Sequence, residues 1–213
     1  MPQPITEPRR QQQQTAEPDR VDGYQEPCQE IELTWAWLEG YPALDFANTV
    51  IRRGWTEYEL ITSVDALSSW LDAAALPAPR PTTVTDDDLQ SFLPLRDASL
   101  RLLRAVTGHG DWHAADVRTL NEALLDCPEV TVLETAGSVV SRTVGSPAPF
   151  SLLLARLAAE VRDVLAGPRP DLALCDAPGC GQLFFQRRTN QAWCGPPCGN
   201  RARVARHHTA TDN

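Results

Sequence analysis

The chain has 213 residues, a formal net charge of −9 at neutral pH, and nineteen basic side chains that are all arginine. This length allows one medium-sized domain with a small appendage, and the apolar content is sufficient for a hydrophobic core. The first twenty residues contain no apolar run, and charged side chains interrupt residues 151–166, the most apolar helical stretch. A secretion signal and a membrane span are therefore not expected, and we expect a cytoplasmic protein.

Residues 1–30 are rich in glutamine, proline and charges of both signs. Such a composition cannot bury enough apolar surface to fold, so we predict a disordered tail. Cys28 in this tail and Cys127 lie far apart in the sequence. In a reducing compartment we expect both to be free thiols.

A strand is expected at 31–38, followed by a helix that begins near Ala43. On that helix Leu44, Ala47 and Ile51 would share one face. A second face would carry the polar residues Asp45, Asn48 and Arg52. Such a stripe either lines a pocket, which would allow an enzyme active site, or packs the helix through hydrogen bonds to neighbouring backbone. We favour packing and keep the three residues as a candidate pocket.

Three further helices are expected before residue 127. Ser63 should cap the first, which ends near residue 75. Thr85 should cap the second, with Asp86–Asp88 in its first turn serving as dipole partners and not as a metal site. Pro94 is expected to kink or split this helix. A third helix, at 112–126, should be capped by Asp111.

His109 and His113 would lie four residues apart on a helix, which is a metal-binding spacing. The glycines at 108 and 110 break any helix there, so we do not expect a metal site at these histidines. Beyond them, alternating residues at 130–134 and 139–144 predict a hairpin. A helix at 150–166 should follow and end at Gly167-Pro168.

Two cysteine pairs, Cys175 with Cys180 and Cys194 with Cys198, are separated by thirteen residues. Paired thiolates at both ends of a short segment suit a single tetrahedral zinc ion. We expect a hairpin between the pairs, with Leu183–Phe185 as one strand and 191–193 as the returning strand. A helix over 201–208 completes a treble-clef-like arrangement.

The segment from Trp193 through Cys198-Gly199-Asn200-Arg201 resembles the CGNR zinc finger. Upstream, the block around Ala43–Thr49, with Leu95–Ala98 and Leu120-Asn121, resembles the ABATE domain. This resemblance implies a stress-related bacterial transcription regulator that binds zinc. We accordingly expect a mostly helical α+β fold comprising an ABATE-like domain at 31–167, a finger at 168–208 and a short tail at 209–213.

The last helix would display side chains that bind phosphates and the base edges of DNA. Residues 169–213 carry six Arg and three Asp, and the remainder carries thirteen Arg and twenty-five acids, giving balances of +3 and −12. The arginines could therefore instead dock the finger on the acidic domain. Two departures from the family also weaken a DNA-binding interpretation: Ala192 stands where the family has a basic residue, and Thr209–Asn213 where it often continues with more arginines. The candidate nucleic-acid contacts are Arg187, Arg188, Asn200, Arg201, Arg203 and Arg206.

DNA is the expected partner, with RNA or protein as alternatives. The upstream domain is expected to sense a small-molecule effector or to mediate assembly, for example as a homodimer. An enzyme with a structural zinc, or a protein-interaction module, remains the alternative function.

Overall fold

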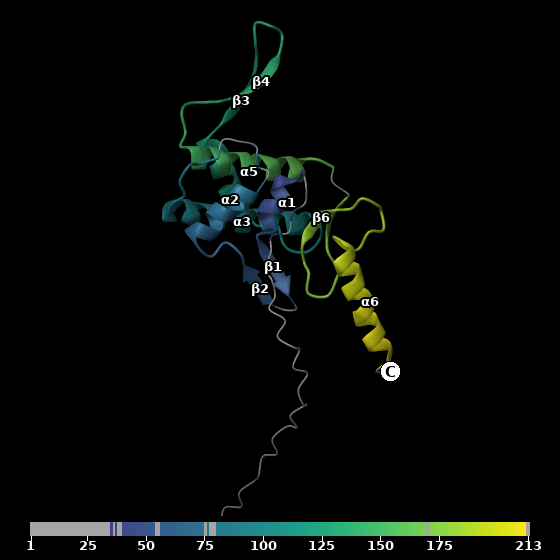
Figure 1. Cartoon of the computed structure of the whole chain (residues 1–213). Helices are drawn as coiled ribbons and strands as arrows, with labels where there is room; N and C mark the ends of the chain where they lie inside the picture. Colours follow the sequence, from purple (N-terminus) through teal and green to yellow (C-terminus); the bar gives the residue numbers. More distant parts are fainter. Residues whose placement is uncertain are drawn as a thin grey trace, which may run out of the picture. The chain divides into compact units, whose positions relative to one another are not determined.

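The computed structural model describes residues 35, 37, 40–53, 56–74, 76, 80–168 and 171–211, although not the side chains of residue 53 and residues 208–211 (Figure 1). The predicted tail at 1–30, with Cys28, lies outside the described residues. So does most of the strand predicted at 31–38.

Six helices and six short strands are described, and the strands form three separate antiparallel pairs. The helices are α1 (Pro42–Ala47), α2 (Val64–Ala73), α3 (Asp86–Val106), α4 (Ala114–Asp126), α5 (Pro149–Ala166) and α6 (Pro196–Thr211). The strands are β1 (Val50–Arg53), β2 (Thr56–Glu59), β3 (Glu129–Leu133), β4 (Val139–Thr143), β5 (Leu172–Leu174) and β6 (Leu183–Phe185). The expected mostly helical α+β class is confirmed.

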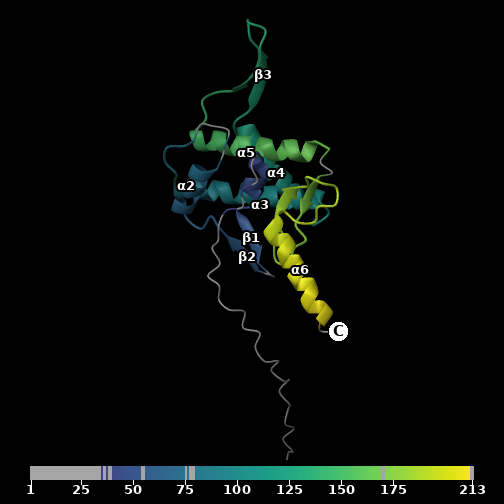
Figure 2. The same ribbon diagram turned by 45° about the vertical axis from the view of Figure 1, so that its right-hand side comes forward.

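One hydrophobic core joins the helices upstream of residue 168. Three fully buried aromatic rings lie at its centre, one each from α1, α2 and α3: Phe46, Trp70 and Phe92. The ring centroids of Phe92 lie 5.0 Å from Phe46 and 5.4 Å from Trp70, in edge-on arrangements that aromatic quadrupoles favour. Helix α5 covers this core with its apolar face (Figure 2).

Helix α1 is shorter than predicted. It ends at Ala47, Asn48 is its C-cap, and the chain turns into β1. The β-branched side chains at 49–51 favour a strand, and pairing with β2 outweighs continuation of the helix. Arg52 therefore lies on a strand. The prediction that Asp45, Asn48 and Arg52 share one face of a helix is wrong. The hairpin β1–β2 was not predicted.

The caps predicted for α2 and α3 are confirmed. Ser63 Oγ accepts from the Ala66 N–H at 3.1 Å, and Thr85 with Asp88 forms a reciprocal capping box. Helix α3 continues through Pro94, an exposed position, so the predicted split does not occur. Helix α4 begins after His113 and not after Asp111, so the predicted cap there is wrong.

A buried arginine connects α3 to the β1–β2 hairpin. Arg96, which is 1% exposed, donates to Thr49 Oγ1 at 2.8 Å and to both carboxylate oxygens of Glu59. Its Nε donates to Asp97 at 2.7 Å. Burial disfavours the charged guanidinium, but these carboxylates outweigh that effect and raise the pKa of Arg96. The two upstream sequence blocks that contain Thr49 and Arg96 thus meet in the fold.

The hairpin β3–β4 is confirmed, with Leu133 opposite Val139 and Glu129 opposite Thr143. It extends beyond α5 in both Figure 1 and Figure 2. The predicted hairpin inside the cysteine-rich segment is different. Strand β6 pairs with β5, and residues 191–193 form no strand.

Strand β6 is attached to the upstream domain through Asn48. The Asn48 side chain donates to the Leu183 carbonyl at 2.9 Å and accepts from the Leu183 N–H at 3.1 Å, so it replaces a neighbouring strand. Asn48 is 2% exposed, and Leu183 and Leu172 belong to the main hydrophobic core. The cysteine-rich segment is therefore built onto the upstream domain.

Replacing Asn48 with alanine should destabilise the protein by about 2–4 kcal/mol, because a buried N–H and a buried carbonyl both lose their partner. Denaturant unfolding of the zinc-loaded protein measures this change. Asn121→Ala, at an exposed site on α4, is the matched control and should change stability by less than about 0.5 kcal/mol. An equal effect of both substitutions would contradict the role of Asn48.

Helices α3 and α4 are joined by Arg101 and Asp116, whose nearest atoms lie 2.7 Å apart. The hydrogen bonds from Arg101 lower the pKa of Asp116. A lowered pKa means that the ion pair stabilises the fold at pH values above the unfolded-state pKa and is lost on acidification.

Asp116→Asn should therefore cost about 0.5–1 kcal/mol near neutral pH, a modest amount because Arg101 is half-exposed and water screens the pair. The difference from the parent protein should begin to shrink near pH 4 and should disappear only as the pH falls through the lower folded-state pKa of Asp116. Unfolding curves of both proteins across this range measure it, with Asp126→Asn on the same helix as the control. A constant difference down to pH 3 would argue against the pair.

Candidate metal centre

Four cysteine sulfurs gather where the strands β5 and β6 meet the start of α6. Cys175 follows β5, Cys180 precedes β6, Cys194 precedes α6, and Cys198 lies in the first turn of α6. All four sulfurs lie within 4.8 Å of one another. Cys175, Cys180 and Cys198 are buried, and no disulfide joins the described cysteines.

The spacing of the sulfurs fits a tetrahedron. A zinc–sulfur bond of about 2.3 Å gives tetrahedral edges of about 3.8 Å. The Cys180–Cys194 and Cys194–Cys198 sulfur separations are 3.8 Å and 3.6 Å. The Cys194 N–H also donates to Cys175 Sγ, at 3.3 Å, and holds these two cysteines together. The donor set matches a closed structural zinc site.

The thiols already influence one another's ionisation. Hydrogen bonds from Cys175 and Cys194 lower the pKa of Cys180, because they stabilise its thiolate. The contacts with Cys175 and Cys180 raise the pKa of Cys194, since its proton is the one they share. The thiolate is the metal-binding form of cysteine, so zinc binding would release the thiol protons that remain in the cluster.

The residues after Cys198 support the cluster. Gly199 lies beside Trp193, and an added Cβ at this position would touch the Trp193 ring at 3.4 Å, an ordinary van der Waals contact. Arg201 donates to the Pro178 carbonyl at 3.1 Å and to Cys198 Sγ at 3.8 Å. Arg201 therefore ties the first cysteine loop to α6 and offsets negative charge on the sulfurs.

The other candidate nucleic-acid contacts divide into three places. Asn200 and Arg203 are exposed on α6, where Arg203 donates to Asn200 Oδ1 at 3.1 Å. Arg206 donates to the Ala202 carbonyl and lies over the Trp193 ring, 5.9 Å from its centroid. Arg187 and Arg188 are exposed together in the loop after β6.

Two of the three candidate pocket residues, Asn48 and Arg52, face the cysteine-rich segment. Asn48 binds Leu183, as described above, and Arg52 lies against Gly181. A Cβ at Gly181 would be 3.4 Å from Arg52 Nε, and the positive φ of 65° there also favours glycine. Asp45 is buried on α1. The structure thus brings Asn48 and Arg52 to the junction between the two sequence blocks.

The remaining metal alternatives receive no support within the described ranges. The sulfur cluster is the only group of potential metal ligands found there. His109 follows α3 in a loop, with Nδ1 3.1 Å from Thr107 Oγ1, and His113 precedes α4. The described part of the chain also contains no helix with the length and apolarity needed to cross a bilayer.

Two family models match the sequence. The ABATE model, described as "Putative stress-induced transcription regulator", matches residues 40–168, and the CGNR zinc finger model matches residues 172–210. The first match alone covers more than half of the chain. The chain belongs to the ABATE family.

In this ABATE protein the upstream domain is followed by a CGNR zinc finger, and its four-cysteine cluster is consistent with zinc. The family resemblance recognised from the sequence is confirmed. A search among curated proteins finds no significant match.

Sequence reasoning missed the docking role of Asn48 and the strand β5. Asn48 stood out in the sequence because it lies in a polar block. The sequence of that block did not indicate that its partner, Leu183, lies 135 residues away. Strand β5 is only three residues long and lies beside the first cysteine, too short for a periodic pattern.

One zinc ion per chain is expected by metal analysis. Cys198→Ser should reduce zinc content and unravel α6, because zinc binding contributes on the order of 10 kcal/mol in small fingers. The buried thiol Cys127, outside the cluster, supplies the matched control, and Cys127→Ala should retain stoichiometric zinc. Equal zinc content in both variants would contradict this assignment.

Proposed function

We propose that this ABATE protein is a zinc-dependent, DNA-binding transcription regulator in which α6 contacts the major groove. The observation that carries the proposal is the outward face of α6. Asn200 and Arg203 are exposed there, one turn apart, on a helix whose buried side holds Cys198 and Ala202. Arginine and asparagine are the side chains that make bidentate contacts with guanine and adenine.

The charge distribution around α6 supports DNA binding over the alternative in which these arginines dock the finger on the acidic upstream domain. Within the described residues, Arg187, Arg188 and Arg203 form no ion pair with a carboxylate of the upstream domain. The finger is held instead by apolar packing and by Asn48. Exposed arginines that take part in none of these ion pairs are suited to bind phosphate groups.

Zinc has a structural role in this proposal. Cys175, Cys180, Cys194 and Cys198 would supply all four ligands, leaving no position for water and therefore no metal-based catalysis. Arg201 would act mainly at the cluster, through Cys198 and the Pro178 carbonyl, and only indirectly on DNA. Arg206, which lies over Trp193, would position the helix.

The upstream domain would supply assembly or effector sensing in the cytoplasm. An active site around Asn48 is disfavoured because the side-chain amide is occupied by the Leu183 backbone on both its donor and its acceptor side. RNA or protein partners would be distinguished from DNA by the binding experiment below.

Binding of the zinc-loaded chain to a mixed-sequence DNA duplex should weaken steeply between about 50 and 200 mM salt. Arg203→Ala should reduce affinity and lower the salt slope by about one, as expected for one lost phosphate contact. Selection from a random-sequence DNA pool then tests whether base recognition is also present.

Arg118→Ala, an exposed arginine on α4, is the matched control and should leave DNA affinity unchanged. Arg201→Ala should instead reduce zinc retention along with binding. A salt-independent response, or equal loss in the Arg203 and Arg118 variants, would overturn the DNA-binding proposal.

A further inference from the structure

Three surface hollows adjoin one another beside the turn that leads into α6. Aromatic rings and one arginine line most of the largest, which has a volume of about 440 Å³: Trp37, Tyr41, Phe184, Phe185 and Arg187. Arg187 also lines the second hollow, while Gly195 and Pro196 of the turn line both the largest and the third. The largest hollow therefore connects the other two, and the three together are here called the track.

The aromatic rings in the largest hollow are exposed and held in place. Tyr41 is 42% and Trp37 37% exposed. Tyr41 packs against Phe185, with ring centroids 4.4 Å apart, and Trp37 stacks on the buried Trp70. Because these contacts already order the rings, a planar group can stack on them at a small cost in entropy. The volume also lies within the range of about 300–1,000 Å³ that is typical of small-ligand sites.

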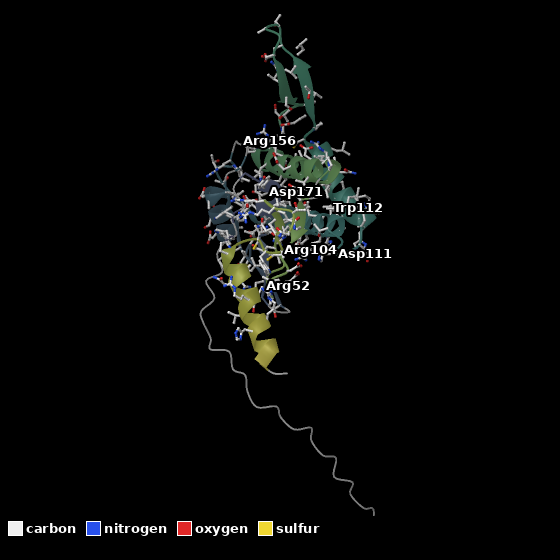
Figure 3. The ribbon with its side chains drawn as sticks, turned by 90° about the vertical axis from the view of Figure 1, so that its right-hand side faces the viewer. Arg52, Arg104, Asp111, Trp112, Arg156 and Asp171 are labelled. Atoms are coloured by element: carbon white, nitrogen blue, oxygen red, sulfur yellow. The ribbon has the colours of Figure 1, made fainter. Side chains whose placement is uncertain are left out.

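Arginines line the hollows on both sides of these rings. Arg187 and Arg188 line the second hollow, and Arg203 with Asn200 lines the third. Within the described residues, none of these three arginines pairs with a carboxylate. Asp171, directly before β5 (Figure 3), is the only carboxylate among the described residues that line the track. An excess of basic side chains beside stacking surfaces is typical of grooves that bind single-stranded nucleic acid.

We propose that the track binds a DNA strand where it leaves the duplex that α6 contacts. One unpaired base stacks on Tyr41 and Trp37 in the largest hollow, and the adjoining phosphates bind Arg187 and Arg188. A double helix keeps its bases stacked inside, so only an unpaired base can use these rings. This assignment rests on the proposed function, because the same helix holds the duplex part of the DNA.

The order of the hollows favours this occupant. Asn200 and Arg203, in the third hollow, belong to the face of α6 proposed for the duplex. A strand that leaves the duplex there meets first the aromatic rings and then the two arginines of the loop after β6. Cys194 lines the largest hollow beside the other sulfurs of the cluster. An uncharged base tolerates the negative charge of thiolates at this place, whereas a phosphate would be repelled.

Fluorescence anisotropy of the zinc-loaded full chain with three DNAs tests the stacking of the base. All share one duplex, which is blunt in the first, carries a short thymidine overhang in the second, and carries an overhang of abasic sugar phosphates in the third. Both overhang polarities are prepared. The thymidine overhang should bind about tenfold tighter than the blunt duplex, as expected for one base stacked on aromatic side chains. The abasic overhang keeps the phosphates but has no base, so it should bind about fivefold more weakly than the thymidine overhang.

Two substitutions localise the effect. Tyr41→Leu keeps an apolar side chain but removes a ring, so it should reduce the preference for the thymidine overhang about threefold or more and leave affinity for the blunt duplex unchanged. Trp112→Leu removes an exposed ring that precedes α4 and is not part of the track (Figure 3), and it should keep the full preference. The Tyr41 side chain makes no capping hydrogen bond, so circular dichroism and zinc content should match the parent protein.

Equal affinity for the blunt and the thymidine-overhang duplex would overturn this proposal and leave duplex binding by α6 standing. So would an abasic overhang that binds as tightly as the thymidine overhang, a comparison that needs no substitution in the protein. Equal losses in Tyr41→Leu and Trp112→Leu would also contradict it. Failure to bind any of the three DNAs would overturn the proposed function as well.

Discussion

The two hydrogen bonds between the Asn48 side chain and the Leu183 backbone are the interaction on which this fold depends. The sheet β5–β6 has only two strands, too few to be stable alone. Asn48 presents an acceptor and a donor to β6 where a third strand would otherwise lie. One amide therefore completes the sheet, and it comes from the domain that the sheet must be joined to.

The finger is consequently held at both ends by different forces. At one end Leu172 and Leu183 pack in the main hydrophobic core. At the other, four sulfurs and Phe184 form a small separate cluster. Burial stabilises the first end without metal, whereas the second has too few apolar atoms and relies on ligand bonds. Cys198 of this second cluster lies in the first turn of helix α6, so we expect the position of α6 to depend on the metal.

Whether a feature of this structure could be predicted from the sequence depends on how far apart in the chain the interacting residues lie. Ser63 and Thr85 were recognisable as caps because capping acts within one helical turn. The cysteine spacing identified the metal centre for the same reason, since tight turns fix each pair. Asn48 could not be assigned a partner, because hydrogen bonds to backbone leave no trace in the partner's side chain. The returning strand at 191–193 was misplaced because three-residue strands have no measurable period.

The shared core at Leu172 and Leu183 has a consequence for dividing the molecule. The family boundary near residue 170 passes through a packed interior, and it separates Asn48 from the backbone that it binds. A chain ended at residue 168 would expose apolar surface and leave a buried amide without partners. The two family segments therefore form one folding unit. A replacement for either segment must reproduce the apolar packing and the backbone hydrogen bonds that join it to the other.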